Sequence, residues 1–249
     1  MPRMMVITAH PDDEAGNFGG SLCLYHDRGV ETCVICLTPG QAATHRGGAR
    51  RDQELAAIRR QEFAASCEIL KVSRGIVLDY PDGHLHRQDL YRVVCALVLH
   101  VRQFRPDVLL TFGPDGGVTA HTDHAMASVF ATLAFHWAGH SNRFTEQLQD
   151  TITLHRTQKL YHSTANFSLP GRQPVMPSPP TTIIDIAKYL DTKIAAFKAH
   201  KTQAPLWPIF EEHVRKREKK ELFHLAASVN SAPVHGETDL FQGVSERRS

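Results

Sequence analysis

The chain has 249 residues, 42% of them hydrophobic and 22% charged, which is ordinary for a globular protein. Its formal net charge is +2, from 28 basic and 26 acidic side chains, so charge does not indicate a nucleic-acid or membrane-surface partner. No stretch reaches the ~20 apolar residues of a membrane-spanning helix, and the first apolar run begins too early for a secretory signal. We therefore expect a cytoplasmic protein without nucleic-acid partners and without a membrane span.

Four short apolar runs rich in β-branched residues predict strands in the first half of the chain, at residues 4–9, 31–38, 75–80 and 107–112. Segments with helical periodicity separate them, at residues 16–28, 52–71 and 90–103. The apolar residues of the last segment fall on one helical stripe, formed by Leu90, Val94, Leu97, Val98 and Val101. Near-continuous apolar strands that alternate with helices predict an α/β fold, a Rossmann-like and mostly parallel sheet flanked by helices.

The second half contains further candidates: helices at 124–139 and 190–200, strands at 158–164 and 181–186, and a charged surface helix at 210–223. The proline-rich stretch 169–180 predicts a loop and not a linker between domains, because strand-like sequence resumes after it. The end from Ser228 is polar, although the sequence ETDLF provides apolar anchors. We expect residues 1–249 to form a single domain.

The cysteines carry no metal or redox signature. There are five of them, an odd number without a pairing pattern, which fits a reducing compartment. Cys33 and Cys36 form a C-x-x-C, but they lie in the second predicted strand. Side chains three positions apart on a strand point to opposite faces, so the two thiols cannot bind one ion. We expect both to be buried apolar residues.

Histidines and carboxylates follow two of the predicted strands, at the ends where open parallel sheets bind ligands. They are His10, Asp12, Asp13 and Glu14 after the first strand, and His121, Asp123 and His124 after the fourth. Two histidines and one carboxylate are a common hydrolytic zinc set, which leaves a fourth position for water. The adjacent Asp12 and Asp13 offer one ligand and one general base.

The helix that follows the first cluster is expected to favour ionised carboxylates at its N-terminus. Gly19 and Gly20 lie in its first turns, where a missing side chain would admit a ligand or another backbone. No G-x-S-x-G, G-x-G-x-x-G or phosphate-loop pattern occurs, so a serine nucleophile and a nucleotide site lack their sequence signatures.

The sequence AHPDDE, followed about 110 residues later by HTDH, resembles the zinc-dependent N-acetylglucosaminyl deacetylases of the LmbE-like and PIG-L family. Three further segments extend this resemblance over nearly the whole chain: RRQEFAASCEIL, YPDG and KAHKTQ. The ending ETDLFQG is also similar. The resemblance implies a single zinc-dependent deacetylase domain that hydrolyses the N-acetyl group of an N-acetylglucosamine-containing conjugate, giving an amine and acetate.

Matching positions imply residue roles. His10, Asp13 and His124 correspond to the zinc ligands of the family, and Asp12 corresponds to the general base that takes a proton from the attacking water. Fe²⁺ or another divalent ion also suits two imidazoles and a carboxylate, so the metal stays open.

Four other positions match residues around the metal. His121 is implied to stabilise the oxyanion, and Asp123 to orient and charge that imidazole. Arg59 and Asp82 match positions that contact sugar hydroxyls. Thiol-sugar relatives have a tyrosine shortly before the first histidine of the second motif, where this chain has Val-Thr-Ala at 118–120.

Alternatives remain at this stage. A non-catalytic, metal-stabilised sugar-binding module would need the ligands but no base, and an amidase for a different amide would use the same residues. A nucleotide- or glycan-processing transferase would need a phosphate-binding loop. The substrate's other half, the metal, the formation of a homo-oligomer and the roles of His84, His86 and His200 stay open, and loops 40–51, 83–88 and 139–154 are expected to line the pocket.

Overall fold

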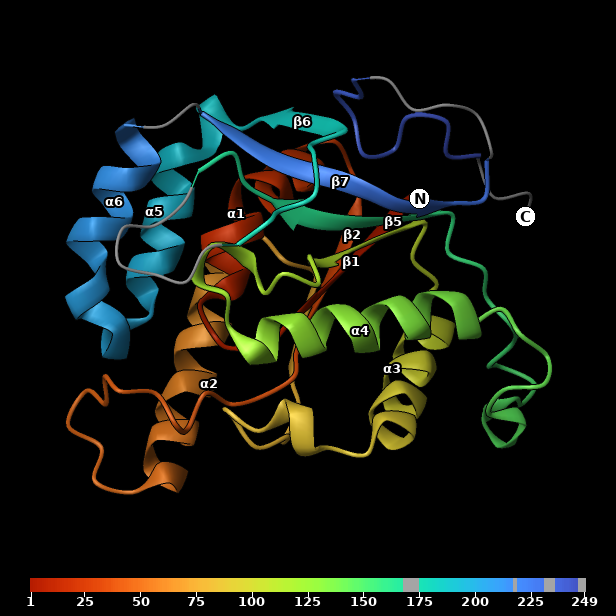
Figure 1. Cartoon of the computed structure of the whole chain (residues 1–249), viewed down its shortest axis with the longest axis horizontal. Coiled ribbons are helices and arrows are strands. Elements are labelled where there is room, and N and C mark those ends of the chain that lie inside the picture. Colours follow the sequence, from red (N-terminus) through yellow and green to blue (C-terminus); the bar gives the residue numbers. More distant parts are fainter. Residues whose placement is uncertain (168–174, 217–218, 231–235, 246–249) are drawn as a thin grey trace.

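One sheet of seven strands, in the order β3-β2-β1-β4-β5-β7-β6, organises the chain (Figure 1). The computed structural model describes residues 1–167, 175–216, 219–230 and 236–245. Its strands are β1 (Arg3–Thr8), β2 (Glu31–Cys36), β3 (Arg74–Val77), β4 (Val108–Phe112), β5 (Lys159–Thr164), β6 (Thr182–Asp185) and β7 (Lys220–Ser228). Neighbouring strands pair in parallel from β3 to β5, and β7 is antiparallel to both β5 and β6. The expected α/β fold with a mostly parallel sheet is confirmed.

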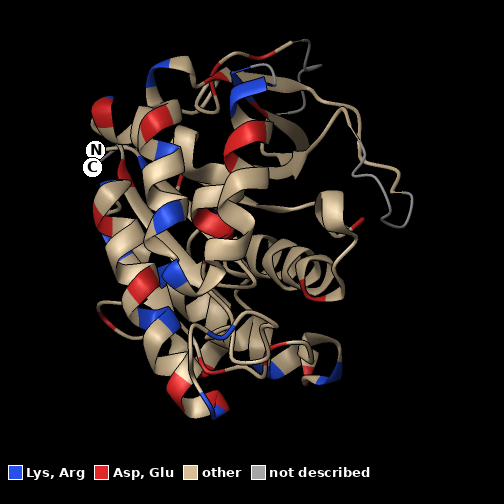
Figure 2. Cartoon of the chain, turned by 90° about the vertical axis from the view of Figure 1, so that its left-hand side faces the viewer, with Lys and Arg blue, Asp and Glu red and all other residues tan. Residues whose placement is uncertain are grey.

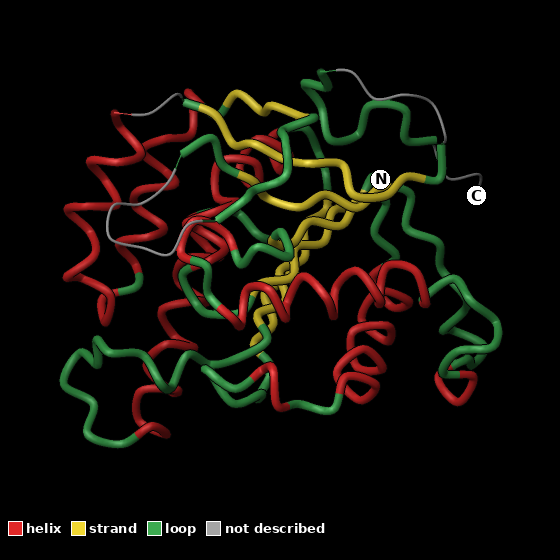
Figure 3. Tube along the Cα trace, viewed as in Figure 1, coloured by secondary structure: helices red, strands yellow, loops and turns green. Residues whose placement is uncertain are grey.

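Helices cover both faces of the sheet (Figure 3). They are α1 (Asp13–Asp27), α2 (Asp52–Ile69), α3 (Leu90–Phe104), α4 (Thr122–Trp137), α5 (Leu190–Ala199) and α6 (Trp207–Lys216). Helix α5 contacts α1, α2 and α6 on one face, and α3 packs on α4 on the other. Acidic and basic residues are interspersed along the helices in Figure 2. None of the described helices is long and apolar enough to cross a membrane.

Most of the apolar pattern is buried as predicted. The expected stripe on α3 faces the core at Val94, Leu97, Val98 and Val101, but Leu90 at the helix start is 39% exposed. All five cysteines are free, and Cys33 and Cys36 are buried in β2. The expectation of buried, unpaired thiols in this strand is confirmed.

The predicted helix over 210–223 is wrong in its second part. Helix α6 ends at Lys216, and strand β7 begins at Lys220. Although Glu and Lys favour helices, pairing with strands on both sides overrides this weak preference. Helix α1 begins at Asp13, three residues before the predicted start. Of the expected proline-rich loop, residues 175–180 have no helix or strand, and residues 169–174 lie outside the described residues.

The glycines of α1 serve packing against side chains. A Cβ on Gly20 would lie 2.6 Å from Ile186, and a Cβ on Gly19 would lie 3.3 Å from Leu70 and Lys193. The expectation that a ligand or another backbone approaches these glycines is therefore wrong.

Replacement of Gly20 by Ala is expected to destabilise the fold, because the new methyl group overlaps the Cβ of Ile186. Overpacking of this kind costs about 1–3 kcal/mol. The matched control is Gly16→Ala in the same helix, whose Cβ would lie 3.8 Å from Phe197, an ordinary contact. Urea denaturation should show a lower free energy of unfolding for Gly20→Ala only. Equal stability of the two variants would contradict the close packing.

Candidate active site

The predicted site lies where the connections of the sheet diverge. Strand β1 is the neighbour of both β2 and β4, and the chain leaves β1 toward β2 but leaves β4 toward β5 on the other side. Such a switch point opens a crevice at the carboxyl ends of the two strands. The segment after β1 carries His10, Asp12 and Asp13, and the segment after β4 leads to His121 and His124. The fold therefore brings together two clusters that are about 110 residues apart.

Asp13 connects the two clusters. It is the first residue of α1 and is 6% exposed. Its Oδ2 accepts hydrogen bonds from the backbone N–H of Ala9 (3.2 Å) and of His10 (2.8 Å). The same oxygen lies 3.6 Å from His10 Nδ1, and Oδ1 lies 3.1 Å from His124 Nε2. Burial opposes ionisation, but His124 and His10 hold the pKa of Asp13 well below its usual value.

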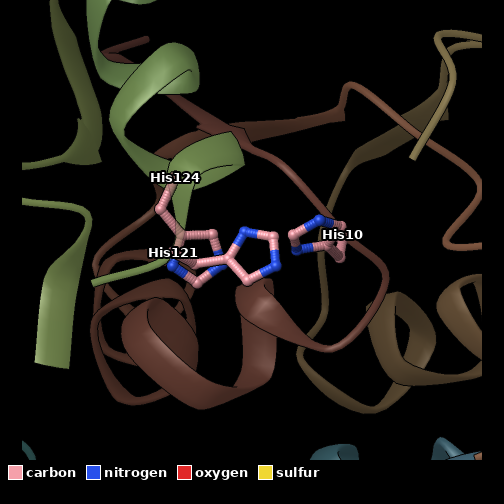
Figure 4. A group of neighbouring side chains, drawn as sticks. All are labelled: His10, His121 and His124. Carbon is pink, nitrogen blue, oxygen red and sulfur yellow. The ribbon is translucent and has the colours of Figure 1, made fainter. Parts of the chain in front are cut away.

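Three histidine rings point toward one another (Figure 4). The ring centroids of His10 are 4.8 Å from His121 and 5.3 Å from His124, and those of His121 and His124 are 5.1 Å apart. One nitrogen from each ring lies within 4.8 Å of the others. His124 also stacks on Phe112, the last residue of β4, with centroids 4.0 Å apart. The aromatic contact fixes the plane of the His124 ring.

Outer contacts assign the ring nitrogens of two histidines. His10 Nε2 lies 3.0 Å from Asp82 Oδ1 and 3.4 Å from Asp123 Oδ2, both acceptors, so it carries the proton. His124 Nδ1 lies 3.2 Å from the carbonyl oxygen of Gly116, so it also carries the proton. The inner nitrogens, His10 Nδ1 and His124 Nε2, both face Asp13, and their lone pairs would be available to a metal in place of the present contacts with that carboxylate.

Gly116 is required for this arrangement. Its φ is +79°, and a Cβ there would lie 2.7 Å from the carbonyl oxygen of His121. Only glycine tolerates both the left-handed backbone and this close approach. The turn thereby presents its carbonyl oxygen to His124.

The positions of these two inner nitrogens and of the Asp13 carboxylate fit a divalent metal. Two tetrahedral ligands, each about 2.1 Å from zinc, stand about 3.4 Å apart. The observed separations of Asp13 oxygens from His10 Nδ1 and His124 Nε2, 3.6 and 3.1 Å, bracket this value. A second group, His10 with Asp82 and Asp123, also converges. That group contains one imidazole and meets it at His10 Nε2, whereas the set that contains Asp13 brings two imidazoles to one carboxylate, as in common hydrolytic zinc sites.

His121 has a different environment from the other two histidines. It is exposed and forms the N-cap of α4, where its Nδ1 accepts a hydrogen bond of 3.1 Å from the backbone N–H of Asp123. Its Nε2 therefore carries the proton and is available as a donor. Although the side chain is exposed, partial desolvation by the surrounding protein, together with His10 and His124, lowers the pKa of His121, so the neutral ring is favoured.

Asp123 contacts different partners from those expected. It is fully buried, and its carboxylate accepts from the backbone N–H of Gly83 (2.7 Å) and of Leu85 (3.1 Å) and lies near His10. The expectation was that this carboxylate orients His121. In the structure, it is the backbone N–H of Asp123 that holds His121, and the carboxylate supports His10. Burial acts to raise the pKa of Asp123, but His10 lowers it overall.

Asp82 and Arg59, the expected sugar contacts, are both engaged with the protein. Asp82 is 8% exposed and accepts from the backbone N–H of Ala42 at 2.8 Å in addition to contacting His10. Arg59 is 2% exposed and donates to the carbonyl oxygens of Pro11 and Gly40. Their contacts with a sugar stay a prediction.

Asp82→Asn is expected to weaken metal binding 10- to 100-fold, as loss of a carboxylate behind a ligating histidine commonly does. The side chain keeps its shape but loses the charge that fixes the proton on His10 Nε2. Competition with a chelating dye measures the affinity. Asp79→Asn is the control, because Asp79 lies on the same loop, is exposed and pairs with Arg60. Equal affinities in both variants would show that Asp82 does not support His10.

Asp12 lies beside the converging groups. Its Oδ2 accepts a 2.8 Å hydrogen bond from Arg59. Burial raises the pKa of Asp12 to about 6, with Asp13 acting in the same direction and Arg59 opposing. A carboxyl group with a pKa in this range is suited to accept a proton near neutral pH.

The surrounding loops follow the expectation in part. The 40–51 and 83–88 loops reach the site through Ala42, Gly83 and Leu85. The 139–154 loop instead follows the C-terminus of α4, while His121 caps its N-terminus (Figure 1). Because α4 has 16 residues, about 24 Å of helix separates the start of this loop from His121. Arg102 binds the 139–154 loop through the carbonyl oxygens of Phe144 and Arg143. The expectation that this loop lines the pocket is therefore wrong.

A parallel-sheet protein with imidazoles and carboxylates converging at its switch point is typical of metal-dependent hydrolases. The chain belongs to the PIG-L family, described as GlcNAc-PI de-N-acetylase, whose family model matches residues 5–135. This description is that of an enzyme that hydrolyses an N-acetyl amide, and several relatives are named as deacetylases. The expected family, fold and enzyme class are therefore confirmed.

The names of individual relatives agree with this enzyme class. The chain is 28% identical to 1D-myo-inositol 2-acetamido-2-deoxy-alpha-D-glucopyranoside deacetylase 2 of Catenulispora acidiphila, over 98% of both chains. It is 26% identical to the diacetylchitobiose deacetylase of Thermococcus kodakarensis, over 86% of this chain and 75% of that one. The structure of N,N'-diacetylchitobiose deacetylase from Pyrococcus horikoshii is similar in fold, with a TM-score of 0.73 at 23% identity, covering 90% and 83% of the two chains.

Proposed function

We propose that this protein is a metal-dependent hydrolase that removes the N-acetyl group from an N-acetylglucosamine-containing conjugate and releases an amine and acetate. The observation that carries the proposal is the convergence of two imidazole nitrogens, His10 Nδ1 and His124 Nε2, on the carboxylate of Asp13, which follows Asp12 directly in the chain. Family membership supports the reaction type, and the named relatives support a 2-acetamido sugar as the substrate class.

We propose His10, Asp13 and His124 as the metal ligands and Zn²⁺ as the metal, with Fe²⁺ as the alternative that the same ligands accept. When bound, a metal of this kind lowers the pKa of water and polarises a carbonyl oxygen. The chain supplies the remaining functions. Asp12 takes the proton of the attacking water and returns it to the departing amine.

His121 stabilises the charge that develops on the amide oxygen during attack. Its backbone-capped Nδ1 holds the ring with Nε2–H outward, so the donor is in place before the substrate binds. Arg59 orients Asp12 through the 2.8 Å contact with Oδ2. Asp82 and Asp123 keep the proton of His10 on Nε2, which leaves Nδ1 for the metal.

The decisive test is acetate release from a panel of N-acetylated glycosides: N-acetylglucosamine, chito-oligosaccharides and glycosides with inositol, malate or lipid aglycones. Activity is expected on at least one of them. A protein that binds these sugars and its metal but releases no acetate would be a binding module, and release from non-sugar amides alone would indicate a different amidase.

Removal of the metal is expected to abolish acetate release. Dialysis against a chelator followed by addition of Zn²⁺ or Fe²⁺ should restore it, and the ion that restores the higher kcat identifies the preferred metal. Unchanged activity after complete chelation, verified by elemental analysis, would rule out the metal-dependent mechanism.

Two further proposals concern the whole chain. Residues 1–249 act as one deacetylase domain, which is supported by contacts of His200 and Glu221 from the second half with α1 in the first. The cytoplasm is the proposed compartment, which is supported by the five free cysteines. Cell fractionation tests the latter.

A further inference from the structure

Asp12 has an unfavourable backbone conformation. Its φ is +116° and its ψ is −26°, outside the left-handed well near +60° where four other non-glycine residues with positive φ lie. Such a conformation persists only where the surrounding structure imposes it. Because φ and ψ set the direction of the side chain, whatever imposes them also aims the Asp12 carboxylate.

Two side chains hold Asp12, whose carbonyl oxygen also accepts a 2.8 Å hydrogen bond from the backbone N–H of Gly16 in the first turn of α1. Arg59 contacts its carboxylate, as described above. On the other side, Glu14 Oε2 accepts a 3.0 Å hydrogen bond from the backbone N–H of Asp12. Among the described residues, no hydrogen bond or ion pair joins Glu14 to the Asp12 side chain, so its effect acts through the peptide group.

Glu14 is itself held by residues from two other elements. Its Oε1 accepts 2.6 Å hydrogen bonds from His200 Nε2, at the C-terminal end of α5, and from Ser66 Oγ in α2. Glu14, His200 and Ser66 are all fully buried. His200 Nδ1 has no hydrogen-bond partner among the described residues, so the polar contacts of this imidazole go to Glu14 alone. The chain of contacts runs from α5 through Glu14 to the peptide of Asp12.

A second buried ion pair shows what a purely structural arrangement looks like in the same helix. Lys193 Nζ lies 2.6 Å from Glu221 Oε1, and Glu221 accepts from the backbone N–H of Gly20 and Ser21. This pair is also buried and also contacts the backbone of α1. It does so two turns away from Asp12, where no proposed site residue lies.

We propose that Glu14 and His200 form a positioning pair that imposes the backbone conformation of Asp12 and thereby aims its carboxylate. The proposal rests on the assignment of Asp12 as the general base. His200 would thus contribute to turnover from a position 186 residues away from Glu14 in the sequence.

The test compares two substitutions of His200. In His200→Gln, the side-chain amide reaches the position of Nε2 and can still donate to Glu14; in His200→Asn, the amide is too short to do so. We expect kcat of His200→Asn to fall by about 100-fold, the effect of a displacement near 1 Å at a reacting group. KM and metal content should stay near the wild-type values, and His200→Gln should recover most of the loss.

Three additional variants separate positioning from general stability. Lys193→Met should lower Tm without changing kcat. In an Asp12→Asn background, His200→Asn should cause no further loss of residual activity, because its effect passes through Asp12. Ser66→Ala, which removes one donor to Glu14 but keeps the ion pair, is expected to lower kcat less than His200→Asn and serves in its place if that variant does not fold.

Crystal structures of the His200 variants give a result that does not depend on activity. We expect φ of Asp12 to become negative in His200→Asn and to stay near +116° in His200→Gln. An unchanged φ in His200→Asn, an unchanged kcat, or a loss that adds fully to that of Asp12→Asn would overturn the proposal. If the wild-type protein released no acetate from any substrate, the proposed function would fail, and φ of Asp12 would still decide whether the pair positions it.

Discussion

Replacement of Asp12 by Asn is expected to lower kcat by about 10³-fold, within the 10²- to 10⁴-fold range typical of general acid–base groups. Asn has the same shape, and its backbone N–H can still donate to Glu14, so we expect the backbone conformation at this position to be retained. Its amide cannot take the proton of the attacking water. The loss therefore reports the chemical role of the carboxylate and not a change of fold.

Metal content by elemental analysis and Tm should stay close to the wild-type values in Asp12→Asn and in Asp12→Ala. Asp27→Asn at the other end of α1 is the control, because Asp27 pairs with Lys188 and Tyr189 on the surface. Steady-state acetate release measures kcat for each protein. Full activity in Asp12→Ala would show that a different group is the base.

Asp13→Asn is expected to weaken metal binding by more than the 10- to 100-fold typical of an outer contact, and activity should fall to background. The substitution keeps the shape of a side chain that accepts two backbone hydrogen bonds. It removes the negative charge that faces His10 and His124. Two imidazoles alone then remain for the ion.

The matched control is Asp107→Asn. Asp107 is similarly buried and accepts a backbone N–H, that of Arg3, but it precedes β4 and so lies at the opposite edge of the sheet. Calorimetric titration with Zn²⁺ should give wild-type affinity for Asp107→Asn and a large loss for Asp13→Asn. Retention of one tightly bound ion in Asp13→Asn would exclude Asp13 as a ligand.

The sequence did not predict which side chains and backbone groups each site residue contacts. The protons on His10 and His124 depend on Asp82, Asp123 and Gly116, which come from segments whose relative positions follow only from the folded chain. For the same reason, the sequence could not show that the carboxylate of Asp123 contacts His10. Motif spacing indicates which residues share a helix. It does not show which of several nearby segments a given side chain contacts in the folded protein.

Glu14 and His200 show the same limit more strongly. Glu14 belongs to the AHPDDE sequence and His200 to KAHKTQ, so a signal was present at both ends. No local pattern pairs residues 186 positions apart, and the positive φ of Asp12 has no signature in the residue type. The same applies to β7, whose charged sequence favours a helix until β5 and β6 pair with it.

By itself, the sequence determined the α/β fold and the meeting of two polar clusters at one sheet edge, because apolar periodicity and the direction of parallel strands are local properties. Only the tertiary structure decided the strand order that places β1 beside β4, the tautomer of each histidine and the backbone conformation of Asp12. These depend on contacts between distant segments, and such contacts form only when the whole chain is folded.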